Sequence, residues 1–293
     1  MEPSVIMSER RQLINLAYRM LGSLSDAEDV VQETYARWYG QSEAQQDEIE
    51  NPAAWLTRVA GRICLDILGS ARVRRERYVG EWLPEPLPER AEWAAPADPA
   101  DPADRVTLDE SVNLAFLVVL ESMTPAERVA FILHDVFRYP FPEVADIVGR
   151  TPAACRQLAS SARRRIGDAR TPTTPPAQRA DLVRDFQTAW AAKDITALIG
   201  LLDPEAVAIA DGGGIVTAKL EPIEGAEQIA RGLLEITTQL PGLTVLARTV
   251  NGQPGLVIQE NGVTTTVMAF EFAGDRITRV FAVRNPEKLR PWA

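Results

Sequence analysis

A short proline-rich stretch, TPTTPP (171–176), divides the sequence into two parts whose hydrophobic patterns differ. Before it, apolar residues recur every three or four positions, which is the spacing of amphipathic helices. An amphipathic run at 177–202 predicts one more helix. After it, short β-branched segments, GIVTAKL (214–220) among them, alternate with glycine and asparagine turns and predict strands. A chain of 293 residues is long enough for two or three domains. The pattern predicts a helical N-terminal part and a C-terminal α+β domain with a curved antiparallel sheet.

The N-terminal part reads as a series of helices. Two are expected within residues 8–40, a third in NPAAWLTRVAGRICLDILGSARVRR (51–75), a fourth at 107–122 and more at 124–166. Ser25 with Glu28, and Thr124 with Glu127, have the spacing of a helix capping box. Residues 80–105 are rich in proline, alanine and acidic residues, which predicts a linker.

The charge of the chain is unevenly distributed. The formal net charge is −10, yet residues 56–80 hold six arginines against Asp66 and Glu76. Residues 150–170 hold another six arginines against Asp168. Two basic islands on an acidic chain suggest two separate surfaces for nucleic-acid phosphates. The alternative is two solvated helix faces without a partner.

The strongest local signal lies in residues 142–166. Two short helices joined by the turn GRT follow the helix-turn-helix plan, in which the second helix enters the major groove of DNA. Arginine and glutamine can read base edges there, and further arginines can hold phosphates. The candidate DNA contacts are Thr151, Ala153, Arg156, Gln157, Ser160, Arg163 and Arg164. An ordinary helical hairpin with a basic end is the alternative.

The residues do not favour catalysis. The single histidine, His134, lies outside the C-terminal part. The carboxylates of that part, which are Asp203, Asp211, Glu224, Glu260 and Glu271, show no spacing that specifies an acid–base pair. Cys64 and Cys155 lie far apart and form no metal-ligand cluster. We expect no enzyme activity, cofactor or metal, and a reduced cytoplasmic location without a signal peptide or membrane span.

The order of these segments resembles one family. SDAEDVVQETYARWY (25–39), the helix at 51–75, a linker, and MTPAERVAFILHDVFRYPFPEVADIVGRTPAACRQLASSARRRI (123–166) are together similar to the bacterial extracytoplasmic-function sigma factors. Such factors bind core RNA polymerase and direct it to promoters. The resemblance implies an all-α sigma domain 2 at 1–79, which binds polymerase and the minus-ten element. It also implies an all-α sigma domain 4 at 106–170, which carries the helix-turn-helix.

The same resemblance implies roles for individual residues. The helix that binds the clamp of the largest polymerase subunit would carry Asp26, Asp29, Val30, Gln32 and Glu33, with the polymerase flap as a second contact. The minus-ten element would be held by Arg58, Arg62, Arg72, Arg74 and Arg75. The helix at 152–165 would read the minus-thirty-five element. Many members carry asparagine where this chain has Gly61-Arg62, so the bases read there are left open.

The C-terminal part resembles a second fold. Residues 177–293 are similar to the SnoaL-like, cone-shaped relatives of nuclear transport factor 2, and a subgroup of sigma factors (the sigma J type) carries this fusion. That subgroup has the marks WLPEP, DGGGK and NPDKL, which appear here as WLPEP (82–86), DGGGI (211–215) and NPEKL (285–289). The resemblance implies regulation in cis through contact between this domain and the sigma domains. A cone can also hold a small ligand, but no residue here specifies one.

An apolar tag in front of a linker needs an explanation. Trp82 and Leu83 stand beside two prolines, which restrict the backbone and lower the entropy cost of presenting an apolar contact. We expect these residues to contact the C-terminal domain. The expected interdomain set is Trp82, Leu83, Pro84, Asp211, Gly212, Gly213, Asn285 and Pro286. Two other functions stay open at this point, namely a cone-fold enzyme and a ligand-responsive one-component DNA-binding regulator.

Overall fold

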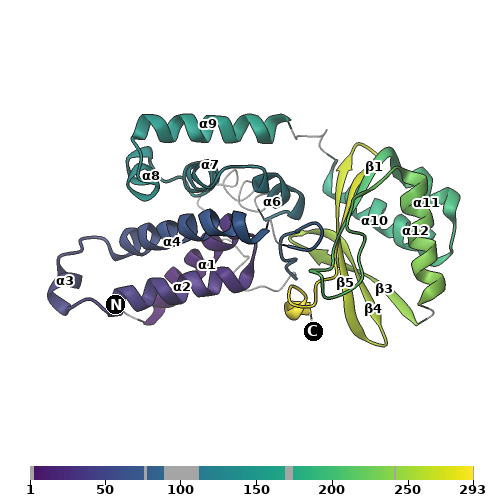
Figure 1. Ribbon diagram of the computed structural model, residues 1–293, viewed down its shortest axis with the longest axis horizontal. Coiled ribbons are helices and arrows are strands. Elements are labelled where there is room, and N and C mark those ends of the chain that lie inside the picture. The colour runs from purple at the N-terminus through teal and green to yellow at the C-terminus, as the bar shows by residue number, and fades with distance from the viewer. Residues whose placement is uncertain (1–2, 76–77, 89–111, 169–173, 241, 293) are drawn as a thin grey trace. The chain divides into compact units, whose positions relative to one another are not determined.

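The computed structural model describes residues 3–75, 78–88, 112–168, 174–240 and 242–292, without the side chains of 3–8, 71–75 and 168. Most of the predicted linker, from 89 to 105, lies outside these residues. The chain divides into two compact units (Figure 1). The helical unit comprises the described residues before 76, Val112 and residues 116–168. The sheet unit comprises residues 78–88, 113–115 and those from 174 onward.

The helical unit begins with α1 (Pro3–Leu21), α2 (Leu24–Tyr39), α3 (Glu43–Asp47) and α4 (Pro52–Arg75). It continues with α6 (Leu114–Glu121), whose first two residues belong to the sheet unit, and then with α7 (Pro125–Phe131), the π-helical turn η1 (Ile132–Val136), α8 (Phe141–Val148) and α9 (Pro152–Asp168). The predicted capping box of Thr124 and Glu127 is confirmed at the start of α7. The cap predicted at Ser25 is wrong, because Ser23 accepts the amide of Asp26 instead.

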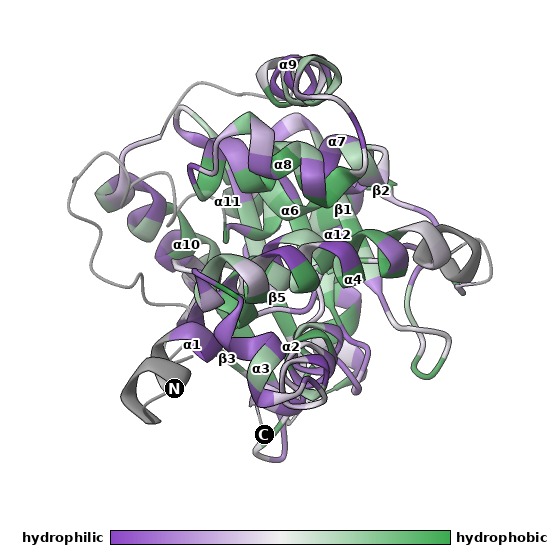
Figure 2. Ribbon diagram, turned by 90° about the vertical axis from the view of Figure 1, so that its left-hand side faces the viewer, coloured by the Kyte–Doolittle hydropathy of each residue, from purple (hydrophilic) through white to green (hydrophobic). Residues whose placement is uncertain are grey.

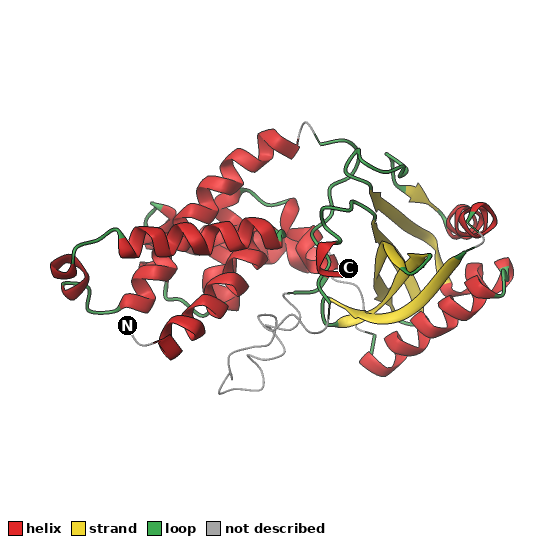
Figure 3. Cartoon of the chain, turned by 90° about the horizontal axis from the view of Figure 1, so that it is seen from below, coloured by secondary structure: helices red, strands yellow, loops and turns green. Residues whose placement is uncertain are grey.

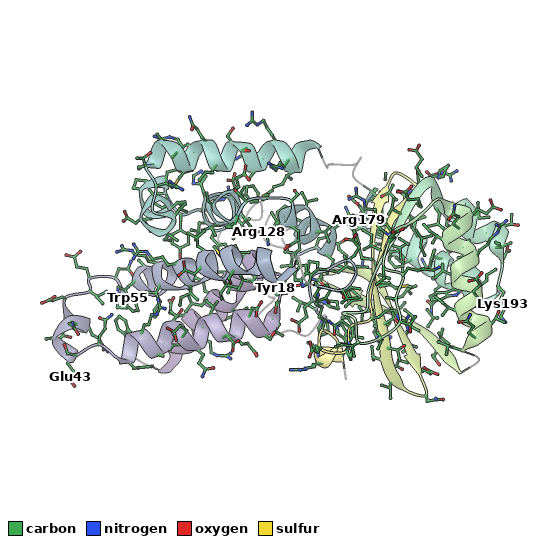
Figure 4. The ribbon with its side chains drawn as sticks, in the orientation of Figure 1. Tyr18, Glu43, Trp55, Arg128, Arg179 and Lys193 are labelled. Atoms are coloured by element: carbon green, nitrogen blue, oxygen red, sulfur yellow. The ribbon has the colours of Figure 1, made fainter. Side chains whose placement is uncertain are left out.

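Tertiary contacts in the helical unit connect its first helices to its last ones. The buried stripe of α1 and α2 packs against α4, and apolar and polar residues alternate along helices such as α8 (Figure 2). Arg128 of α7 is 3% exposed, and its guanidinium donates to the carbonyl oxygens of Met20 (3.0 Å) and Leu120 (2.5 Å) and to Glu121 (2.7 Å) (Figure 4). Burial lowers the pKa of Arg128 to about 10, so the group keeps its charge at neutral pH.

The turn between α8 and α9 confirms the helix-turn-helix geometry. Gly149 ends α8 in the left-handed region, with φ 68°, which a residue with a Cβ rarely adopts. Val144, Ile147 and Val148 on α8 are buried, as is Cys155 on α9. The exposed face of α9 is therefore held on a packed helical base.

The sheet unit is an α+β fold, as predicted. Its elements are α10 (Pro176–Ala191), α11 (Ile195–Leu201), β1 (Leu202–Asp211), β2 (Ile223–Glu224), α12 (Ala226–Gln239), β3 (Leu243–Val250), β4 (Gln253–Glu260), β5 (Val263–Ala273), β6 (Arg276–Val283) and the 3₁₀ turn η2 (Arg290–Trp292). The strand order is β2-β1-β6-β5-β4-β3, and the sheet curves strongly (Figure 3). Helices α10, α11 and α12 supply the core with the inner face of the sheet.

Several strand predictions hold and others fail. The Asn-Gly pairs at 251–252 and 261–262 form two-residue hairpin turns with positive φ at both positions. The sheet is not wholly antiparallel, because β1 and β6 pair in parallel. Such a pair needs a long connection, which α12 and three hairpin-linked strands provide. The strand predicted at 214–220 is a loop, and the helix predicted at 177–202 is two helices. In the described part of the chain, no helix is long and apolar enough to cross a bilayer.

Candidate functional site

The predicted minus-thirty-five residues all lie on one exposed surface of α9 and its cap. Thr151 caps the helix by accepting the amide of Ala154 at 3.2 Å. All seven residues predicted there (Thr151, Ala153, Arg156, Gln157, Ser160, Arg163 and Arg164) are exposed. Positions 153, 157, 160 and 164 share one helix face, as do 156, 160 and 163. The helix thus presents polar and cationic side chains in the arrangement that major-groove recognition needs.

Some of these arginines have partners inside the helical unit. Arg163 donates from Nε (2.6 Å) and Nη2 (3.2 Å) to the two carboxylate oxygens of Asp135, which lies on η1. Arg165 lies 3.8 Å from Glu127. The guanidinium of Arg156 lies over the ring of Phe141, at 5.6 Å from its centroid. The basic surface is therefore partly neutralised and partly held in place by side chains that precede α9.

The predicted minus-ten arginines lie on α4. Arg58 and Arg62 are exposed, whereas the side chains of Arg72, Arg74 and Arg75 lie outside the described part of the chain. Arg62 Nη2 donates to the carbonyl oxygen of Asp146 at 2.8 Å, near the C-terminus of α8. A helix C-terminus carries partial negative charge, so it suits a cation. In this structure Arg62 is engaged by the helix-turn-helix.

Two further contacts fix α4 and α1 against the later helices. A Cβ on Gly61 would lie 2.8 Å from Cγ2 of Ile147, so α4 and α8 approach as closely as a glycine permits. The hydroxyl of Tyr139, between η1 and α8, lies 3.0 Å from the Thr57 hydroxyl and 3.3 Å from the Gln12 amide. Burial raises the pKa of Tyr139, which keeps this hydroxyl protonated.

The helix predicted to bind polymerase is α2. Asp29, Gln32 and Glu33 are exposed, and Asp26 is half-buried beside the cap. Val30 is fully buried, so its prediction as a surface contact is wrong. It belongs to the inward stripe of α2, together with Ala27, Val31, Thr34 and Trp38. The exposed face of α2 is therefore acidic and polar, and Val30 packs beneath it.

The segment from Tyr78 to Pro88, here called the docked segment, packs onto the sheet unit, to which it belongs. Asp211, at the end of β1, has no exposed surface. Its Oδ1 accepts the Tyr78 hydroxyl at 2.6 Å and the Gly213 amide at 3.0 Å. Its Oδ2 accepts the Leu83 amide at 2.9 Å. Burial and the bond to Asp211 raise the pKa of Tyr78, so the phenol stays a donor.

Lys288 completes this site from the C-terminal NPEKL motif. Its ammonium donates to Oδ2 of Asp211 at 2.7 Å and to the carbonyl oxygen of Leu83 at 2.5 Å. It also lies 4.2 Å from the ring centroid of Trp82 and 5.1 Å from that of Tyr78. The Lys288 side chain is 11% exposed and that of Asp211 is 0% exposed. The buried Asp211–Lys288 ion pair, with the rings of Tyr78 and Trp82 beside it, therefore holds the docked segment at its centre. These four residues, together with Asn251 and Trp292, are called the grip below.

The rest of the docked segment is held by backbone pairing and apolar burial. The amide of Leu87 donates to Oδ1 of Asn251 at 2.9 Å, and the Asn251 amide donates to the Leu87 carbonyl at 2.9 Å. The Trp292 indole donates to the Pro86 carbonyl at 2.8 Å. Leu83 and Leu87 are each 1% exposed.

The predicted interdomain set comes together around this grip, with one exception. The amide of Asn285 donates to the Tyr78 hydroxyl at 2.9 Å, and a Cβ on Gly213 would lie 2.3 Å from Nδ2 of Asn285. Gly213 has a φ of 62°, so this close approach and its backbone both need glycine. Pro286 is the exception, because it is exposed at the turn that follows Asn285.

Chemical sites of other kinds are less evident. Among the described residues, no group of three or more His, Cys, Asp or Glu side chains is placed to hold a metal ion. Glu271 is half-buried on β5, and its Oε2 lies 3.3 Å from Nη1 of Arg279. Burial raises the pKa of Glu271, and the Arg279 charge opposes this. A single carboxylate paired with an arginine is a structural arrangement and does not form an acid–base pair.

Comparison with known proteins identifies the family. Residues 5–77 match sigma-70 region 2, and residues 113–166 match sigma-70 region 4. The chain is 35% identical over 285 residues to the probable ECF RNA polymerase sigma factor SigI of Mycobacterium tuberculosis, covering 97% of this chain and 93% of the relative. The chain belongs to the extracytoplasmic-function (ECF) sigma factors.

Similarity to other ECF sigma factors extends over both units. SigJ of Mycobacterium tuberculosis is 34% identical over 302 residues, covering 99% of this chain and 93% of SigJ. The crystal structure of that SigJ superposes with a TM-score of 0.76 and 31% identity, over 99% of each chain. This ECF sigma factor therefore has an α+β unit in addition to its two sigma regions, and SigJ matches the chain over that unit too.

Sequence reasoning missed four residues of the grip in this ECF sigma factor, namely Tyr78, Asn251, Lys288 and Trp292. One signal was available for Lys288. The usual lysine of the DGGGK mark is Ile215 here, so Lys288 of NPEKL is the one lysine that the three marks still offer to the acid at 211. Asn251 was assigned only to a hairpin turn, and its side chain has a second use that no local pattern reveals.

Proposed function

We propose that this ECF sigma factor binds core RNA polymerase and directs it to promoters, and that the sheet unit regulates it in cis. The family assignment supports the first part. The exposed residues of α2 support polymerase docking, and the basic surfaces of α4 and α9 support promoter contact at two elements. Work on polymerase would place the protein in the cytoplasm. The boundaries proposed for the sigma domains are 1–79 and 106–170.

The grip on the docked segment carries the regulatory part of the proposal. The segment lies in the chain between the two sigma regions, and only residues 76 and 77 separate α4 from Tyr78. The three peptide steps from Arg75, the last residue of α4, to Tyr78 span about 10 Å at most. Docking of the segment therefore limits how freely the basic end of α4 can move relative to the sheet unit.

A tethered unit acts at a high effective concentration, on the order of millimolar for a short flexible linker. Contacts that would be weak between separate molecules then hold the docked state. Binding to polymerase and promoter competes with the docked state and shifts the population toward molecules in which the segment is released. We infer that the sheet unit works by binding and not by catalysis, because its central carboxylate, Asp211, is fully used by Tyr78, Leu83, Gly213 and Lys288.

The test is transcription in vitro with core polymerase and the full chain. Trp82→Ala removes the ring beside Lys288 and should release the segment in a larger fraction of molecules. Trp93→Ala, the same change within the predicted linker sequence, is the matched control. We expect Trp82→Ala to raise promoter-dependent transcription at limiting sigma factor. Activity equal to that of the control would refute cis regulation, and a decrease would refute its inhibitory sense.

Truncation of the chain complements the point variant. Removal of residues 177–293 takes away both the core of the sheet unit and the grip. If the unit restrains the sigma regions, the shortened chain should exceed the full chain in transcription per molecule bound to polymerase. Failure of the full chain and the shortened chain alike to start transcription would refute the sigma-factor assignment of function itself.

A further inference from the structure

The residues that precede α9 form an unusual local structure. Between α7 and α8 the chain makes a π-helical turn at Ile132–Val136, where the Phe137 amide bonds to the Ile132 carbonyl at 3.1 Å. Arg138 then takes a positive φ of 61°. Turns of this kind are rare and frequently lie at functional sites. This one places His134 at the start of the helix-turn-helix.

An aromatic stack follows from this placement. The ring of His134 stacks on Phe141, the first residue of α8, with centroids 3.8 Å apart and an angle of 26°. Nδ1 of His134 is 2.9 Å from the Tyr139 carbonyl oxygen, so the imidazole is fixed at its other edge as well. Phe141 is half-buried. The Phe141 ring is therefore held in one position by the His134 imidazole, which the Tyr139 carbonyl oxygen fixes in turn.

The guanidinium of Arg156 lies over this fixed ring at 5.6 Å from its centroid. Arg156 is exposed on the predicted reading face of α9. A guanidinium that lies on an aromatic ring keeps its N–H donors at its edge, where they remain available for hydrogen bonds. The bidentate contact of arginine to O6 and N7 of guanine uses those donors. The stack thus holds Arg156 without using the groups that would read a base.

We propose that Phe141, fixed by His134, is a positioning residue that preorganises Arg156 to read one base pair of the minus-thirty-five element. The proposal rests on the proposed function of α9. The stack acts through entropy. A long arginine side chain loses much of its rotamer freedom on binding DNA, and a side chain already ordered on the Phe141 ring has less conformational entropy left to lose. An exposed cation–π contact is expected to contribute about a two- to five-fold effect on affinity.

The experiment uses the full chain assembled with core polymerase and DNA fragments randomised across the minus-thirty-five element. Sequencing of bound fragments at fixed salt gives the base preference at each position. Arg156→Ala should flatten the preference at one base pair, by roughly five-fold or more. Phe141→Leu should flatten the same base pair by about two- to five-fold and leave the other positions unchanged. Phe141→Trp should retain the preference.

Phe116→Leu, at another half-buried phenylalanine of the helical unit, is the matched control and should leave every preference intact. If Arg156→Ala flattens a position and Phe141→Leu does not, the positioning role is refuted and the proposed DNA-reading surface stands. If Arg156→Ala flattens none, the reading role of Arg156 fails and the inference fails with it. If Phe141→Leu flattens every position equally, as a general distortion of α8 and α9 would, Phe141 is structural only and the positioning role is refuted.

Discussion

Replacement of Lys288 by methionine should loosen the docked segment by an amount that the structure allows us to work out. The substitution keeps an unbranched, flexible side chain that is one atom shorter and removes the charge. The segment loses the charged hydrogen bond to the Leu83 carbonyl, which contributes about 1.5–3 kcal/mol. It also loses the contacts to the Trp82 and Tyr78 rings, at about 0.5–1 kcal/mol each where partly exposed. Because some of these contributions overlap, we expect a total of about 2–4 kcal/mol.

The unpaired Asp211 acts in the same direction. In the variant its carboxylate stays buried while the segment is docked, with the donors of Tyr78, Leu83 and Gly213 still in place. Release of the segment lets water reach the carboxylate. The desolvation of Asp211 therefore destabilises the docked state and does not destabilise the released state. The loss of Lys288 therefore favours release beyond the contacts that it removes directly.

Hydrogen exchange of the full chain measures this release. The amides of Leu83 and Leu87 are bonded to Asp211 and Asn251, so they exchange when the segment opens. With tenfold for each 1.4 kcal/mol, both should exchange roughly thirty-fold to several hundred-fold faster in Lys288→Met. Lys193→Met, an exposed lysine between α10 and α11 (Figure 4), is the control. Acceleration below about three-fold relative to that control would refute the central role of the ion pair.

Three further predictions concern other parts of the molecule. Gly61→Ala should speed amide exchange where α4 meets Ile147 with little change in global stability, because a gain in helix propensity of about 1 kcal/mol offsets the steric conflict. Asp135→Asn should tighten holoenzyme binding to promoter DNA and steepen its salt slope by about one unit, because Arg163 then faces a phosphate without a competing anion. Because the pKa of Glu271 is raised by burial, its stabilising contribution is present at acid pH and declines as pH rises above about 4.3. Urea unfolding of Glu271→Gln should therefore show a flatter loss of stability between that pH and neutrality.

Local signals in the sequence predicted local structure well. The Asn-Gly hairpins, the capping box at Thr124 and the helix-turn-helix depend on residues close together in the chain, so their physics is visible without a partner. The wrong cap at Ser25 shows where such signals become ambiguous. Two serines lie two residues apart, and the positive φ of Gly22 ends α1 early enough for Ser23 to start α2.

Predictions that depended on distant segments were incomplete. The strand predicted at 214–220 fails because the chain turns at its start, where the Gly212 carbonyl accepts the amides of Ile215 (3.1 Å) and Val216 (3.2 Å). The motifs around 82, 211 and 285 were expected to meet, and they do lie together, but Tyr78 and Lys288 were not named. Their positions depend on which side chains the fold turns inward, and hydrophobic patterns carry little information on that choice for a tyrosine or a lysine.

The composition of the grip suits a contact that must open. Burial of Leu83 and Leu87, each 1% exposed, contributes about 1.5–3 kcal/mol apiece relative to exposure. The Asp211–Lys288 pair adds less than its short distance suggests, since the desolvation of both charges offsets much of their attraction. On release, however, both charges regain water, so the open state is not strongly disfavoured. The leucines therefore supply most of the affinity, while the charged centre sets the register of the segment through the Leu83 amide and carbonyl. A segment held in this way docks at one register and can still be displaced by a partner as large as polymerase.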